Sequence, residues 1–142
     1  MSIPACRKTG AIFFYYVPVY YENTDAGGVA YHADYLKFAE RARTEYLRYM
    51  GLSQKTLQQE ASILFVVHQM QITFHAPAFL DDVICVQTQL YKFSGVRFNF
   101  YQNLYRGKTL LVKGDISVAC VSPQGNVCKV PTVIRQIIQR HL

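Results

Sequence analysis

The sequence predicts an α+β fold in which one long helix packs against a mostly antiparallel sheet, and three observations support this. Helical periodicity is concentrated in residues 34–50, and apolar and polar residues alternate over much of the chain after them. The chain contains 11 Tyr and 9 Phe but no Trp, and aromatic rings favour half-buried strand positions. The length of 142 residues suits a single domain over residues 1–142.

The long helix is expected over residues 34–50. Its apolar side chains recur at spacings of three and four, at Tyr35, Ala39, Ala42, Tyr46 and Tyr49. Asp34 is expected to accept from the free N–H groups of the first turn, and Gly51 suits the left-handed residue that ends a helix. Ser53 is expected to cap a short second helix that runs to Glu60.

Strands are expected on both sides of the long helix. The first lies within residues 11–21, and the others lie over residues 64–75, 83–91, 96–105 and 110–120. In the strand that begins at residue 64, one face is expected to carry Leu64, Val66, Met70, Ile72 and Phe74. Pro131 is expected to open a terminal helix that ends near Arg140.

Composition narrows the classes of function. Fifteen Lys and Arg against nine Asp and Glu give a net charge of +6, which favours an anionic ligand, a nucleic acid or a membrane surface without choosing among them. The longest stretch without charged residues, 61–80, carries polar side chains at alternate positions, so no membrane span is expected. The four Cys show no metal-ligand spacing and indicate reduced thiols of a cytoplasmic protein.

Two familiar signatures fail. Gly107-Lys108-Thr109 resembles the end of a phosphate-binding loop, but Gln102 stands where that motif needs Gly. His68 and His75 differ by an odd number on one strand, so they point to opposite faces and cannot share a metal ion. No metal site is therefore expected.

The segment from Tyr20 to Tyr35 carries the candidate chemistry. It reads YYENTDAGGVAYHADY, with the carboxylate of Asp25 just before the flexible pair Gly27-Gly28. This loop leads into a helix N-terminus, whose free N–H groups carry a partial positive charge. A carboxylate facing such an oxyanion site is a hydrolytic arrangement. The alternative, that Asp25 only makes an Asx-turn, stays open on the residues alone.

This segment also carries a resemblance to a known family. Residues 20–32, with YLKF at 35–38 and ERARTE at 40–45, resemble the Tol-Pal-associated acyl-CoA thioesterases, a branch of the 4-hydroxybenzoyl-CoA thioesterase-like hotdog family. The resemblance extends to about Val130 and includes FVV at 65–67, APA at 76–78 and DD at 81–82. One departure is Asn23, which stands where the branch usually has Asp.

The resemblance implies both an architecture and an activity. The implied architecture is a hotdog fold whose subunits pair edge to edge as a homodimer or homotetramer, with the active site at their interface. The implied activity is hydrolysis of acyl-CoA to a carboxylic acid and coenzyme A, which is part of the substrate, so no separate cofactor is expected. Acyl carrier protein stays open as an alternative acyl donor, and so does the acyl chain length.

The resemblance also assigns roles to residues of the loop and helix. Asp25 matches the catalytic aspartate, as nucleophile or general base, and the backbone N–H of His32 matches the donor to the thioester carbonyl. The His32 imidazole is a further candidate contributor. Gly28 is expected to allow close backbone approach, and Tyr31 is a candidate for lining the acyl pocket. Glu40 is an alternative carboxylate, since another branch of hotdog thioesterases uses one from this helix.

Three later residues are candidates for binding the nucleotide end of coenzyme A. Lys92 and Ser94 match the family region that touches it, and Lys129 is a further candidate for its phosphates. Two rival functions stay open. A hotdog hydratase or dehydratase would need His32 and Asp25 placed together for proton abstraction. A non-catalytic module would bind acyl-CoA or acyl carrier protein without using Asp25, whereas no motif for binding nucleic acid is present.

Overall fold

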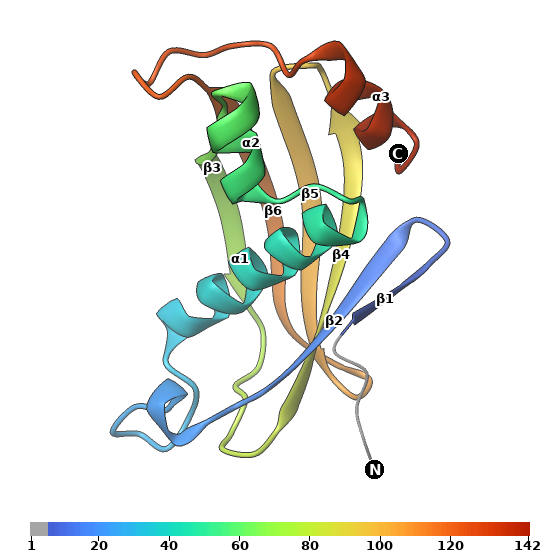
Figure 1. Ribbon diagram of the computed structural model, residues 1–142. Helices are drawn as coiled ribbons and strands as arrows, with labels where there is room; N and C mark the ends of the chain where they lie inside the picture. The colour runs from blue at the N-terminus through green and yellow to red at the C-terminus, as the bar shows by residue number, and fades with distance from the viewer. Residues whose placement is uncertain (1–5) are drawn as a thin grey trace.

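The computed structural model describes residues 6–142. Six antiparallel strands form one sheet in the order β1-β2-β4-β5-β6-β3, and the sheet curves around helix α1 (Figure 1). The strands are β1 (Cys6–Thr9), β2 (Ile12–Pro18), β3 (Leu64–Phe74), β4 (Val83–Phe93), β5 (Arg97–Arg106) and β6 (Thr109–Val121). The helices are α1 (His32–Tyr49), α2 (Gln54–Ala61) and α3 (Thr132–Gln139), and a 3₁₀ turn, η1, spans Tyr21–Asn23. The predicted fold class is confirmed.

Helix α1 begins two residues earlier than predicted. Tyr31 precedes it in an extended conformation, so Asp34 is the third helical residue and not the cap. The predicted end of the helix is confirmed, because Gly51 follows with φ of +86°. The predicted cap of α2 is confirmed as well, since the Ser53 hydroxyl accepts from the backbone N–H three residues later at 3.1 Å.

The N-terminal strands also differ from the prediction. β1 was not predicted, and it pairs with β2 as a short hairpin. β2 ends at Pro18, earlier than the predicted strand, because η1 turns the chain from Tyr21 to Asn23. The Val19 N–H still donates to the Asp82 carbonyl at 2.8 Å, which extends the contact with the chain before β4.

Strand β3 contains an irregularity that reverses its faces. Its pairing with β6 shifts between Val67 and Gln69. Phe65 packs against the core before this shift, and Ile72 does so after it. The prediction that Val66 shares a face with Met70 and Ile72 is wrong, because a bulge between them moves the following side chains to the other face; Val66 is 43% exposed.

β3 is also an open edge of the sheet. It is 11 residues long and pairs on one side with β6, and within residues 6–142 no strand pairs with its other side. Val66 and Val67 are 43% and 45% exposed on it. A long apolar edge with unpaired backbone groups is typical of a strand that pairs with another chain.

A buried polar network joins α1 to the sheet. Gln102 on β5 is 1% exposed. Its amide donates to the Thr88 hydroxyl at 2.9 Å and to the Ala39 carbonyl at 3.0 Å. Its Oε1 accepts from Arg43 Nη1 at 2.8 Å. Because both Ala39 and Arg43 belong to α1, one side chain fixes where this helix lies on β4 and β5.

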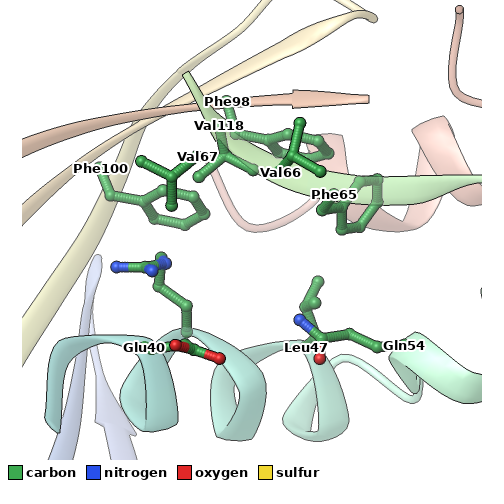
Figure 2. A pocket seen from close by; sticks show the side chains of 10 residues that line it. Glu40, Leu47, Gln54, Phe65, Val66, Val67, Phe98, Phe100 and Val118 are labelled. Atoms are coloured by element: carbon green, nitrogen blue, oxygen red, sulfur yellow. The ribbon is translucent and has the colours of Figure 1, made fainter. Parts of the chain in front are cut away.

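A cavity of about 290 Å³ remains between the helices and the sheet, next to β3. In Figure 2, Glu40, Leu47 and Gln54 lie on the helical side, and the opposite side is formed by Phe65, Val66, Val67, Phe98, Phe100 and Val118.

Among the described residues, no helix combines the length and the apolar character that crossing a bilayer requires.

Candidate active site

Asp25 lies in a tight loop between η1 and α1. The N–H of Gly27 donates to Asp25 Oδ1 at 2.8 Å, so the Asx-turn that the sequence left open is formed. A Cβ at Gly27 would lie 3.2 Å from that same oxygen, and Gly28 has φ of +81°, which requires glycine. Within residues 6–142 no hydrogen bond reaches Asp25 Oδ2. The turn therefore orients the exposed carboxylate and leaves one oxygen available for chemistry.

Backbone hydrogen bonds hold this loop against its neighbours. The Asp25 N–H donates to the Val29 carbonyl at 2.9 Å, and the Ala30 N–H donates to the Ala78 carbonyl at 2.8 Å. The Tyr31 N–H donates back across the loop to the Asn23 carbonyl at 2.7 Å. The loop therefore enters α1 in a fixed geometry.

A buried hydrogen bond ties the start of the loop to the first turn of α1. Asn23 Nδ2 donates to Asp34 Oδ2 at 2.9 Å, and the two residues are 6% and 5% exposed. Asn23 Oδ1 accepts from the Tyr20 N–H at 2.8 Å, and Lys37 Nζ lies 3.5 Å from Asp34 Oδ1. The departure from the family pattern at position 23 thus has a local reason, because a carboxylate at position 34 needs a donor opposite it.

His32 is the first residue of α1. In the described part of the chain its backbone N–H makes no hydrogen bond, as expected of the first turn of a helix. Its exposed imidazole lies beside the Tyr31 ring, at 4.6 Å between centroids, and 6.2 Å from the Phe74 ring. The free N–H can donate to an oxygen that develops negative charge.

Asp25 and His32 line two different hollows. The hollow at Asp25 has a volume of about 450 Å³ and is lined by Tyr21, Thr24, Asp25, Ala26, Gly28 and Leu80. The hollow at His32 has a volume of about 280 Å³ and is lined by Ala30, His32, Tyr35, Phe74, His75, Ala76 and Pro77. Burial raises the pKa of the Tyr35 hydroxyl, and the charge of Asp25 adds to this rise.

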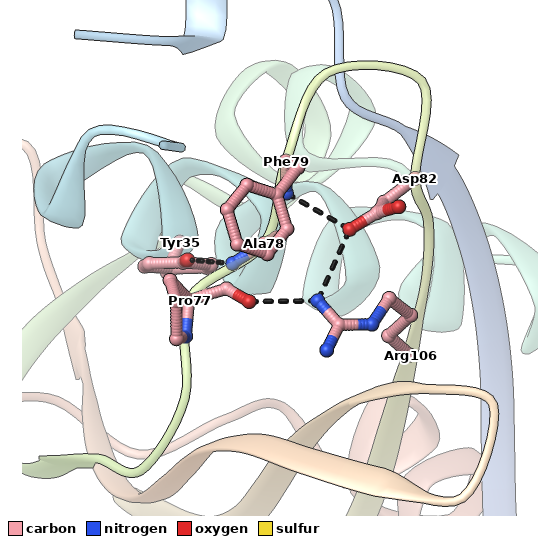
Figure 3. A network of polar contacts seen from close by, with 6 residues as sticks. All are labelled: Tyr35, Pro77, Ala78, Phe79, Asp82 and Arg106. Atoms are coloured by element: carbon pink, nitrogen blue, oxygen red, sulfur yellow. Dashed lines mark hydrogen bonds and ion pairs between the residues drawn. The ribbon is translucent and has the colours of Figure 1, made fainter. Parts of the chain in front are cut away.

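The loop of residues 75–82 borders both hollows and is held by polar contacts (Figure 3). The Tyr35 hydroxyl accepts from the Ala78 N–H at 2.9 Å. Arg106 Nη1 donates to the Pro77 carbonyl at 2.7 Å and to Asp82 Oδ2 at 3.1 Å. These contacts give the APA and DD segments a structural role, because they fix the wall that the two hollows share.

The candidate nucleotide-binding residues lie at the opposite end of the sheet. Lys92, Ser94 and Lys129 are all exposed. The Val130 N–H donates to the Gly95 carbonyl at 2.8 Å, which brings the segment after β6 onto the turn between β4 and β5. The 11 residues of β4 separate this end from the loop of residues 75–82 by about 35 Å. A single chain therefore does not bring the two sets of candidates together.

Two other candidates lie away from both hollows. Tyr31 is 46% exposed and contacts the His32 ring, but it borders neither hollow. Glu40 lies eight residues beyond His32, about 12 Å along the helix, and lines the cavity of Figure 2.

Across residues 6–142, no three His, Cys, Asp or Glu side chains gather in a group that could hold a metal ion.

The sequence analysis missed residues that shape the site. Phe74 was expected only as a member of the apolar face of its strand, yet it is half exposed and lines the hollow at His32. Arg43 was not singled out, yet it is buried against the cavity of Figure 2. Periodicity does not reveal either placement. Phe74 is exposed although it shares a face of β3 with Ile72, because it is the last residue of the strand, and Arg43 is buried because of how α1 sits on the sheet.

Fold and loop geometry together define a thioesterase-type hotdog protein, and comparison with known proteins agrees. The sequence profile of the thioesterase-like superfamily matches residues 19–138. The chain belongs to this superfamily. The family resemblance seen in the sequence and the hotdog fold that it implies are therefore confirmed.

Individual relatives are similar over most of their length. The acyl-CoA thioesterase YbgC of Haemophilus influenzae is 48% identical over 109 residues, which cover 77% of this chain and 80% of that protein. The acyl-CoA thioester hydrolase YbgC of Escherichia coli O157:H7 is 45% identical over 113 residues, 79% of this chain and 84% of that protein. The crystal structure of a probable thioesterase from Bartonella henselae matches with a TM-score of 0.83 and 33% identity, over 85% of this chain and 100% of that chain.

The buried bond between Asn23 and Asp34 can be tested by exchanging donor and acceptor. Asn23→Asp should lower the free energy of unfolding at neutral pH by roughly 2–3 kcal/mol, because two buried carboxylates then face each other without a donor. The loss should shrink as the pH falls and either carboxyl takes up a proton. Denaturant unfolding curves at several pH values measure both effects.

Two controls separate this bond from a general effect of added charge. Asn126→Asp makes the same change in an exposed turn and should leave stability nearly unchanged. Asn23→Asp combined with Asp34→Asn restores a donor and an acceptor in reversed order and should recover most of the loss. An Asn23→Asp variant as stable as the wild type at neutral pH would contradict the assignment.

Proposed function

We propose that the protein is an acyl-CoA thioesterase that hydrolyses the thioester to a carboxylic acid and coenzyme A. The observation that carries the proposal is the Asp25 carboxylate, oriented by the Gly27 N–H directly before a helix whose first N–H is free. Membership of the thioesterase-like superfamily and the activity named for the YbgC relatives support it.

Asp25 and the start of α1 have complementary roles in this mechanism. The thioester carbonyl accepts a hydrogen bond from the His32 N–H, and the partial positive charge of the helix stabilises the oxyanion. Asp25 either attacks the carbonyl carbon or takes the proton of a water that attacks it. In both routes the carbon–sulfur bond breaks and the coenzyme A thiolate leaves; in the first route, water then hydrolyses the anhydride formed with Asp25 and releases the carboxylic acid.

Two subunits that pair along β3 would complete the site. The Phe74 end of this strand borders the hollow at His32, whereas Leu64 pairs with Val121 at the other end of the sheet. Antiparallel pairing of two β3 strands therefore places the hollow at His32 of one subunit beside the opposite end of its partner. That end carries Lys92 and Lys129, so one coenzyme A reaches both sets of residues.

Two alternatives fit the geometry less well. A hydratase needs the His32 imidazole as an acid or base, but this ring lies beside the rings of Tyr31 and Phe74, and the thioesterase route uses only the backbone N–H of His32. A non-catalytic module would leave the oriented carboxylate of Asp25 unused. Acyl carrier protein as the donor, a dimer of dimers and a cytoplasmic location stay predictions.

The role of Asp25 is tested by Asp25→Asn. The amide keeps the size of the side chain and can accept from the Gly27 N–H, but it cannot act as a nucleophilic carboxylate or take up a proton. We expect kcat for thiol release to fall by roughly 10² to 10⁴, with unchanged melting temperature and oligomer mass. Asp81→Asn is the matched control on a neighbouring exposed loop and should keep near-normal turnover. Near-normal turnover in Asp25→Asn would refute the assignment and direct attention to Glu40.

The roles of Lys92 and Lys129 are tested by replacing each with Ala. Both side chains are expected to bind phosphate without touching the reacting bond, so KM for acyl-CoA should rise while kcat stays nearly constant. A truncated thioester without the nucleotide should be affected much less. Lys108→Ala, in the turn between β5 and β6 at the other end of the sheet, serves as the control. Equal losses on both substrates would count against nucleotide binding.

The pairing along β3 is tested by mass and by activity. Light scattering should give a dimer or tetramer at micromolar concentration, and a mass near 16.3 kDa would exclude it. Val67→Lys puts a charge on the open edge and should shift the protein toward the monomer, with at least a tenfold loss of activity. Val133→Lys, at an exposed position on α3, should change neither property.

A further inference from the structure

Helix α1 buries a guanidinium at the wall of the apolar cavity shown in Figure 2. Arg43 is 9% exposed and lines this cavity together with Phe65, Phe98 and Phe100. Within the described chain, its one hydrogen bond joins Nη1 to Gln102 Oε1 at 2.8 Å. A guanidinium carries five N–H donors, so the protein provides an acceptor for only one of them.

The other donors of Arg43 face accessible space. Among the described side chains, Arg135 Nε is the only nitrogen or oxygen that is both fully buried and without a partner. The unpaired nitrogens of Arg43 therefore keep some exposure, and the cavity is the space that this residue lines. Burial lowers the pKa of Arg43, while the nearby charge of Glu40 opposes that change. The cation thus lies in a poorly solvated position with donors to spare.

Glu40 supplies an acceptor on the same side of the cavity. It lies one helical turn before Arg43 on α1, and its side chain also lines the cavity (Figure 2). The formal charges of the two residues cancel. Most of the remaining wall is apolar, formed by Phe, Val and Leu side chains. A suitable occupant is therefore a hydrocarbon chain that carries one neutral group able both to accept and to donate.

We propose that this cavity binds the acyl chain of the substrate and that Arg43 determines specificity for acyl groups that carry a hydroxyl. The inference rests on the proposed thioesterase function. The hydroxyl oxygen accepts from Arg43, and the hydroxyl donates to Glu40. A carboxylate would be repelled by Glu40. A plain alkyl chain would leave the spare donors of Arg43 unpaired among apolar side chains, which disfavours its binding.

Pairing along β3 connects this cavity to the reacting bond. In one chain, Arg43 lies eleven residues beyond His32, about 16 Å along α1. In two antiparallel β3 strands, the Phe65 end of one lies near the Phe74 end of the other. Because Phe65 lines the cavity and Phe74 lines the hollow at His32, the acyl chain enters the cavity of one subunit from the thioester site of its partner.

The test compares acyl-CoA thioesters of equal chain length that end in a methyl, a hydroxyl or a carboxyl group, in matched sets of graded length. At the best length, wild-type kcat/KM should be about 10- to 100-fold higher for the hydroxyl than for the methyl compound. Arg43→Met removes the donors but keeps an unbranched side chain, and it should abolish this preference. Arg43→Lys keeps the buried cation and should retain part of the preference for the hydroxyl compound. This variant tests the inference if Arg43→Met does not fold.

Each outcome bears on one claim. Equal or faster turnover of the methyl compound by the wild type would overturn the inference, and so would an unchanged preference in a folded Arg43→Met. Fastest turnover of the carboxyl compound would overturn the choice of a hydroxyl. Calorimetric binding to Asp25→Asn repeats the comparison without turnover. Thiol release from none of the compounds, with preferential binding of the hydroxyl compound in calorimetry, would refute the proposed function but support the specificity of the cavity.

Discussion

The position of α1 on the sheet is the constraint on which the rest of the structure depends, and the buried amide of Gln102 fixes it. This side chain contacts α1 through both Ala39 and Arg43 and contacts β4 through Thr88. With the helix held there, its first N–H groups face the end of the sheet that holds the Asp25 loop. Its middle, held off the sheet at β3, leaves the cavity of Figure 2. The hydrogen bonds of Gln102 thus help to position both the start of α1 beside the Asp25 loop and the cavity next to β3.

In the proposed dimer, the distance between the exposed lysines and Asp25 within one chain would be bridged by a second subunit. The exposed Lys92 and Lys129 lie at one end of the sheet, and Asp25 lies at the other. Phosphate binding is favoured by nearby cations. A cation beside Asp25, however, would pair with its carboxylate, which thioester cleavage needs free. The proposed antiparallel pairing along β3 would keep the two regions apart within each subunit and bring them together between subunits.

The sequence was sufficient to predict the fold class, the long helix and most strands, because their periodicity extends over many residues. Errors arose where one distant contact decides the outcome. Asp34 was predicted as a cap because local propensity favours it, but Asn23 holds it in the first turn. Val66 was predicted on the same face as Met70 and Ile72, because apolar alternation gives no signal of the bulge that lies between them. The Asp25 loop was predictable from its motif, whereas its separation from Lys92 depends on strand order, which periodicity does not report.

Arg43 is the clearest place where function and stability conflict in this chain. Removing a guanidinium from water costs several kcal/mol, and a single hydrogen bond from a neutral amide offsets only part of this cost. An apolar side chain of similar length would avoid that penalty but would leave the buried Oε1 of Gln102 without a donor, so one N–H group of Arg43 has a structural role and the other four do not. Residues that violate the local rules of folding tend to lie at functional sites, where the binding of a ligand compensates. The unused donors of Arg43 therefore point to a ligand that satisfies them, and the cavity beside β3 is where such a ligand fits.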